Sequence, residues 1–71
     1  MLMTPLTRLR KAAPGSLTAA SIAAFFRKKS FPRDVRTIGD FERGRYIKPP
    51  DRFIELYAEA IGVPVSRVRT A

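Results

Sequence analysis

The chain has 71 residues and a formal net charge of +8, with 14 lysines and arginines against six aspartates and glutamates. It has no cysteine and no histidine, which excludes disulfides and thiolate metal sites and removes the usual general base of hydrolytic enzymes. This composition predicts a non-enzymatic domain without cofactor, metal or small-molecule ligand, and a small basic domain of this kind binds polyanions electrostatically.

A first helix is predicted to start at Thr4-Pro5. The threonine supplies a capping hydroxyl, and proline suits the first helical position because its missing amide hydrogen costs nothing there. Leu6 and Leu9 have helical spacing, and Pro14-Gly15 should end the helix.

A second helix should begin near Ser16 or Thr18 and run through Phe26, because Ile22, Ala23 and Phe26 recur at intervals of three and four residues. The three cations after Phe26 either extend this helix by a turn or begin a loop. The proline within residues 30–32 marks a break.

The third helix has two candidate caps, Ser30 and Asp34, of which Asp34 is favoured. Ile38 and Phe41 are three residues apart and can share one buried face, so the remaining positions form a polar, mostly cationic face. Gly44 should end the helix, since glycine reaches the left-handed conformation without a side-chain clash.

Residues 45–50 contain two successive prolines and should form an irregular connection. The fourth helix is predicted from apolar residues at helical spacing, which are Phe53, Leu56, Tyr57, Ala60 and Ile61. Gly62 should end it, and Val63-Pro64 should begin a short fifth helix in which Val65 and Val68 pack back on the core. The sequence therefore predicts an all-α, compact five-helix bundle that forms a single domain over residues 1–71.

Positive charge is concentrated in the middle of the chain. Between Arg27 and Lys48 eight cations face three carboxylates, a net of +5, whereas Pro49 to Ala71 has three charges of each sign. This division favours one side that faces a polyanion and one structural side. No apolar run approaches the ~18 residues of a membrane span, so the protein is expected in the cytoplasm without a membrane partner.

Several segments, taken in order, resemble the Cro/C1-type (XRE-like) helix-turn-helix family of small phage and bacterial repressors. The segments that match it are Leu6 to Lys11, Leu17-Thr18, Ile22-Ala23, Phe25-Phe26, Ile38, Phe41 to Gly44, and Ile61-Gly62-Val63 with Val65. The resemblance implies the lambda-repressor-like fold and a sequence-specific regulator of transcription. Its third helix, about residues 34–43, would enter the major groove of double-stranded DNA.

Two positions depart from the family pattern. Ala19 stands where the family usually has a glutamine that contacts phosphate. The join between Phe26 and Asp34 is about five residues longer than the usual tight turn, so the turn between the second and third helices is lengthened.

Matching positions along the third helix gives the residues that would contact bases: Arg36, Val35, Asp40, Arg33 and Thr37. Arg36 can donate two hydrogen bonds to guanine, Val35 can pack on a thymine methyl group, and Asp40 can accept from cytosine. Val35 fits the core equally well, and Asp40 equally suits the orientation of neighbouring arginines.

The resemblance and the charge pattern assign a second set to phosphate: Thr18, Arg43, Arg45, Lys48, Lys28 and Lys29. Tyr46 either reaches a phosphate or covers the core. Glu42 is expected to be structural, because the carboxylate at that place in the family pairs with an arginine, for which Arg10 is the first candidate.

Two other classes of function compete with this interpretation. A structural nucleic-acid binder would neutralise phosphate without reading bases, and a protein-interaction module, such as an antitoxin, would use the fourth or fifth helix. The neutral C-terminal third also suits a homodimer surface.

Overall fold

The computed structural model describes residues 4–13 and 17–70 of the chain. Over these ranges the backbone forms five α-helices and no β-strand, which confirms the predicted all-α class. The helices are α1 (Pro5–Ala12), α2 (Ala19–Lys28), α3 (Val35–Glu42), α4 (Asp51–Ile61) and α5 (Val65–Thr70). None of the helices in the described ranges has both the length and the apolar character that crossing a bilayer requires.

Side-chain oxygens cap the first three helices at their N-termini. The oxygens of Thr4, Thr18 and Asp34 each accept a hydrogen bond from the backbone amide three residues further on, at 3.2, 3.1 and 2.9 Å. The prediction of Thr4 is confirmed, and Asp34 is confirmed over Ser30 as the cap of α3. Thr18 caps α2, whereas the alternative start at Ser16 lies outside the described residues.

Three helices end at residues with a left-handed backbone: Ser30 after α2 (φ 59°), Gly44 after α3 (φ 76°) and Gly62 after α4 (φ 76°). The two glycines confirm the predicted ends of α3 and α4. At the end of α2 the cations extend the helix, which runs two residues past Phe26. The predicted stop of α1 at Pro14-Gly15 lies outside the described residues.

The end of α2 is closed by two hydrogen bonds and an apolar contact. The amide of Ser30 donates to the carbonyl of Arg27 at 3.1 Å, and the amide of Phe31 donates to the carbonyl of Phe26 at 3.0 Å. The ring of Phe31 meets that of Phe26 edge-on, with centroids 6.2 Å apart. This pattern is a Schellman motif with serine at the position usually taken by glycine, and it turns the chain toward α3.

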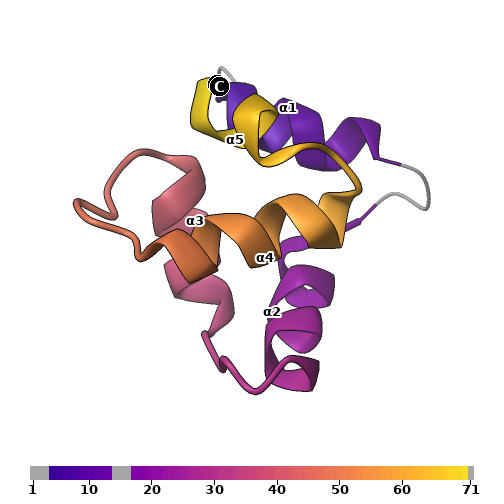
Figure 1. The fold of residues 1–71 in the computed structure, drawn as a ribbon, viewed down its shortest axis with the longest axis vertical. Helices are drawn as coiled ribbons and strands as arrows, with labels where there is room; N and C mark the ends of the chain where they lie inside the picture. Colours follow the sequence, from indigo (N-terminus) through magenta and orange to yellow (C-terminus); the bar gives the residue numbers. More distant parts are fainter. Residues whose placement is uncertain (1–3, 14–16, 71) are drawn as a thin grey trace.

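Aromatic side chains of α4 form the centre of the core. Phe53, Leu56 and Tyr57 are fully buried, and α4 crosses the middle of the molecule in Figure 1. The ring of Phe53 packs edge-on against Phe26 of α2 and Phe41 of α3, with centroids 4.9 Å apart in both pairs. Because α2 and α3 both pack on α4, their orientation relative to each other is fixed by this contact.

The remaining elements lie at the two sides of α4. α1 and α5 lie next to each other on one side (Figure 1), and residues of both helices line an open groove of about 400 Å³. Val68 of α5 is buried and Val65 is partly buried, as predicted. The irregular connection between α3 and α4, also predicted, loops out from the body at the left of Figure 1 and ends at Pro49-Pro50.

Candidate nucleic-acid interface

α3 has one buried and one accessible face. Ile38 is fully buried and Phe41 nearly so, whereas Arg36 is exposed and Thr37 and Asp40 are partly exposed. The predicted division of this helix into an apolar and a polar stripe is therefore confirmed. The polar stripe is the surface that α3 can offer to a partner.

Val35 lies on the accessible side of α3. Its exposed fraction is 47%, so the alternative that it belongs to the core is wrong. It stands next to Arg36 in the first turn, where both side chains are free to reach outward.

Asp34 organises the first turn of α3. Its Oδ1 accepts hydrogen bonds from the amide of Thr37 at 2.9 Å and from the Thr37 hydroxyl at 2.8 Å. Both bonds stabilise the charged carboxylate and lower the pKa of Asp34 below its ordinary value of 3.8. The bond from the backbone amide has the larger effect. The hydroxyl proton of Thr37 is thereby directed to Asp34, while the lone pairs of that oxygen stay free to accept.

An open groove of about 580 Å³ separates the polar stripe of α3 from the connection that follows it. Its lining comes from these two elements and from the segment just before α3, and it consists of Arg33, Thr37, Asp40, Arg45, Tyr46, Ile47 and Lys48. The structure thus brings together three predicted base-contacting residues and two predicted phosphate-contacting ones. Arg36 and Val35 stand outside this groove, on the exposed part of α3.

The one carboxylate in this lining has a cationic partner. Oδ1 of Asp40 lies 3.2 Å from Nη2 of Arg43, and both side chains are partly exposed. The guanidinium of Arg43 also covers Gly39, where a Cβ atom would lie only 3.2 Å from Nη2. This geometry supports the orienting role considered for Asp40, and it leaves the cations of the groove as the dominant charge.

Arg33 is positioned at the start of α3 by two local contacts. Its guanidinium stacks on the ring of Phe31, 4.2 Å from the centroid, and Nη1 donates to the carbonyl of Pro32 at 2.7 Å. A stacked guanidinium loses less rotamer freedom when it binds an anion than a mobile one does. Arg33 is therefore a prearranged cation at the groove.

Four predicted phosphate contacts do not line the groove: Arg43, which pairs with Asp40, and three residues of α2 and its ends. Thr18 caps α2, where its hydroxyl also lies 3.1 Å from Ser21 Oγ. Lys28 is the last residue of α2 and is exposed. Lys29 is turned toward α4, since its Nζ lies 3.3 Å from Oε1 of Glu59.

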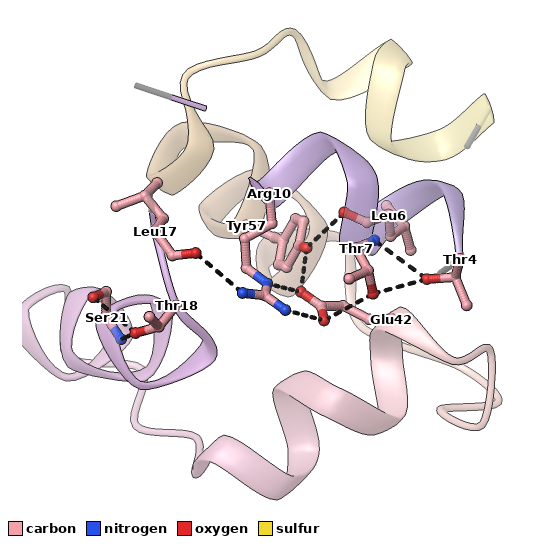
Figure 2. A network of polar contacts seen from close by, with 9 residues as sticks. All are labelled: Thr4, Leu6, Thr7, Arg10, Leu17, Thr18, Ser21, Glu42 and Tyr57. Carbon is pink, nitrogen blue, oxygen red and sulfur yellow. Dashed lines mark hydrogen bonds and ion pairs between the residues drawn. The ribbon is translucent and has the colours of Figure 1, made fainter. Parts of the chain in front are cut away.

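A buried polar network fixes the C-terminal end of α3 (Figure 2). Arg10 of α1 donates to both carboxylate oxygens of Glu42, from Nε at 2.6 Å and from Nη2 at 3.1 Å, which confirms the predicted pairing. The Thr7 hydroxyl donates to Oε1 at 3.2 Å, and the Tyr57 hydroxyl donates to Oε2 at 2.6 Å. Glu42 thus receives bonds from α1 and α4 and ties both helices to α3.

The network also perturbs two pKa values. The hydrogen bond to Glu42 raises the pKa of Arg10 despite burial, so the guanidinium stays charged. Burial is the main cause, and the hydrogen bond to Glu42 the second, of a pKa of Tyr57 that is well above its ordinary value of 10.0.

Arg10 also donates from Nη1 to the carbonyl of Leu17 at 3.0 Å, which holds the segment that leads into α2. The network is structural, and it fixes both α2 and α3.

The sequence leaves Tyr46 open between a phosphate contact and a cover of the core, and the structure bears out the second, because its ring packs edge-on against Phe53 with centroids 5.2 Å apart. Sequence reasoning missed one residue of the groove. Ile47 was not singled out, although its exposed fraction of 87% is the higher of the two large exposed apolar residues in the described ranges. The available signal was an isoleucine between cations in a segment that two prolines keep out of any helix.

In comparisons with known proteins, the chain matches no protein-family model, no curated protein sequence and no solved structure. The function proposed below is therefore argued from the sequence and the geometry of the site.

Proposed function

We propose that this protein binds double-stranded DNA in a sequence-specific manner and acts as a transcriptional regulator. In this proposal α2, residues 29–34 and α3 form a helix-turn-helix unit, and α3 enters the major groove. The six-residue connection is longer than the usual turn, but the Schellman motif at Ser30 and the packing of α2 and α3 on α4 give the pair a defined geometry.

One observation carries the proposal. The accessible face of α3 presents side chains that can read base edges, and the groove beside it is lined by cations that can bind phosphate, on one side of a chain with net charge +8. Direct readout needs both elements, because phosphate contacts position a protein on the duplex and base contacts specify the site.

The roles of the residues follow from their positions. Arg36 and Val35, exposed on α3, are assigned to base edges, together with Thr37 as an acceptor. Arg45, Lys48 and Arg33, which line the groove, are assigned to phosphates; for Arg33 this replaces the base contact expected from sequence. Asp40 is assigned to the orientation of Arg43, and no residue is assigned a catalytic role.

Selection of bound duplexes from a random pool tests the proposal, followed by fluorescence anisotropy on the selected site. We expect a consensus, and an affinity whose log-log dependence on salt has a slope of about −5 if some six phosphates are neutralised. A flat salt response would reject DNA binding altogether. Binding that random competitor DNA abolishes would instead favour the structural nucleic-acid binder.

The symmetry of the selected site also tests the homodimer proposed for the C-terminal third of the chain. A two-fold repeat with half-sites about 34 Å apart is expected for a dimer that places two copies of α3 on one face of the duplex. A single asymmetric site together with a monomer mass in solution would contradict the dimer.

A further inference from the structure

Ile47 is an apolar side chain that the fold presents to solvent. Its exposed fraction is 87%, and it stands in the α3–α4 connection with Arg45 two residues before it and Lys48 directly after it. All three residues line the groove beside α3. The loop therefore offers an apolar group between two cations.

The loop that carries Ile47 is anchored on both sides. The amide of Arg45 donates to the carbonyl of Asp40 at 2.8 Å as part of the Schellman motif that ends α3. The ring of Tyr46 packs on Phe53, and the carbonyl of Pro50 accepts from the amide of Phe53 at 3.0 Å. A loop fixed in this way loses little conformational entropy on binding, so the exposed isoleucine is preorganised for contact.

The groove has two walls of different chemistry. Thr37 and Asp40 belong to the α3 wall, while Ile47 and its flanking cations form the loop wall. A DNA strand has the complementary alternation, because its anionic phosphates are separated by deoxyribose groups with apolar faces. If α3 lies in the major groove of DNA, the DNA strand that borders the major groove can occupy the groove of the protein. The loop wall then meets that strand from the minor-groove side.

We propose that the α3–α4 loop grips one DNA strand from the minor-groove side, with Ile47 packed on deoxyribose and base edges and with Arg45 and Lys48 on the flanking phosphates. This inference rests on the proposed DNA binding and adds a second contact surface to it. Apolar side chains packed into the minor groove are a recognised way to add affinity without base-specific hydrogen bonds.

The test compares Ile47→Ala with Arg45→Ala on the selected duplex, over a range of salt concentrations. Loss of the apolar contact should weaken binding roughly 5- to 20-fold with an unchanged salt slope, because no counterion is involved. Arg45→Ala should instead flatten the slope by about one. Equal affinity of Ile47→Ala and the parent protein would overturn the inference, whereas absence of DNA binding by the parent protein would reject the proposed function itself.

Two further variants locate the contact. Hydroxyl-radical footprinting at saturating protein should show that Ile47→Ala loses protection at minor-groove sugars. Val35→Ala, the matched change on α3, should weaken binding through its base contact but keep this protection once the duplex is saturated. Ile47→Lys adds a cation to the loop and should still bind more weakly than the parent protein; tighter binding would show that the loop acts only through charge. A dimer that dissociates in Ile47→Ala would assign the residue to a second copy of the chain and overturn the inference.

Circular dichroism and thermal unfolding serve as the folding control. Ile47→Ala should leave both unchanged, since the side chain is largely outside the core. A changed footprint in a variant with parental stability therefore reports on the DNA contact alone.

Discussion

Nε of Arg10 lies 2.6 Å from Oε2 of Glu42, so an ion pair joins α1 to the last residue of α3 across 32 positions of the chain. The two side chains are only 11% and 4% exposed. With little water to screen or replace it, this pair makes the placement of α3 depend on α1, a helix that lies outside the proposed DNA-binding unit. The Tyr57 hydroxyl adds α4 to the same carboxylate.

Removal of Glu42 should therefore destabilise the whole domain. We expect Glu42→Ala to lower the free energy of unfolding by about 3–5 kcal/mol, because Arg10 is left without its anion. Tyr57→Phe removes one hydrogen bond to a charged acceptor and should cost about 1.5–3 kcal/mol. Urea unfolding followed by circular dichroism measures both.

An exposed pair provides the control for this prediction. Arg52 and Glu55 of α4 are both about half exposed, and Nη1 of Arg52 lies 3.6 Å from Oε1 of Glu55. Glu55→Ala should therefore change the free energy of unfolding by less than about 0.5 kcal/mol. Comparable losses in Glu42→Ala and Glu55→Ala would contradict a special role of the buried network.

Asp34 should make the stability of α3 depend on pH. Because folding lowers its pKa, the carboxylate contributes stability above its ordinary pKa of 3.8, and that contribution disappears as the pH falls through the lowered value. Asp34→Ala should thus melt at a lower temperature than the parent protein at neutral pH, with the gap closing under acid conditions.

Asp34→Asn separates capping from charge. Asparagine caps helices about as well as aspartate, so this variant should melt near the parent at neutral pH but lack the acid-dependent contribution of this residue. A difference in melting temperature between Asp34→Ala and the parent that stays constant as the pH falls would show that ionisation of Asp34 does not contribute to the pH dependence of stability.

Ser30 provides a stabilising substitution. Its left-handed backbone is unfavourable for a residue with a Cβ atom, and glycine is the residue that Schellman motifs prefer at this place. Ser30→Gly should therefore raise the free energy of unfolding by about 0.5–1 kcal/mol. Gly62→Ala, the opposite change at the end of α4, should lower it; a destabilised Ser30→Gly would contradict the account of this turn.

The sequence predicted helix positions well because the signals for them are local. Capping residues such as Thr4 and Asp34 and helix-ending residues such as Gly44 act within a few positions, and the spacing of Phe53, Leu56 and Tyr57 identifies the buried face of α4. The Arg10–Glu42 pair was predicted only through the family resemblance.

The arrangement of the groove could not be predicted in the same way. It depends on how the α3–α4 connection folds back beside α3, and the loop is held by tertiary contacts such as that between Tyr46 and Phe53. The break within residues 30–32 was predicted from its proline, but the left-handed conformation of Ser30 was not, because serine has no preference for it and the turn is supported by the packing of Phe31 on Phe26.

The absence of asparagine and glutamine from the whole chain restricts how bases can be read. The bidentate amide contact to adenine is excluded, so direct readout depends on Arg36 with guanine, on Val35 with a thymine methyl group and on Thr37 as a single acceptor. We expect the selected consensus to contain at least one essential G·C pair. A consensus of A·T pairs alone would contradict the proposed register of α3 in the major groove.

Arg36→Ala tests this readout at a single base position. The variant should lose about 10- to 100-fold in affinity for the selected site and much less for random duplexes, because a bidentate arginine contact discriminates one base pair. Lys48→Ala is the matched control, since loss of a phosphate contact should weaken binding to every sequence alike. Arg36 is exposed and lies opposite the buried Ile38, so the melting temperature should not change. If Arg36→Ala weakened all duplexes equally, Arg36 would be a phosphate contact, and sequence recognition would have to come from Val35 and Thr37.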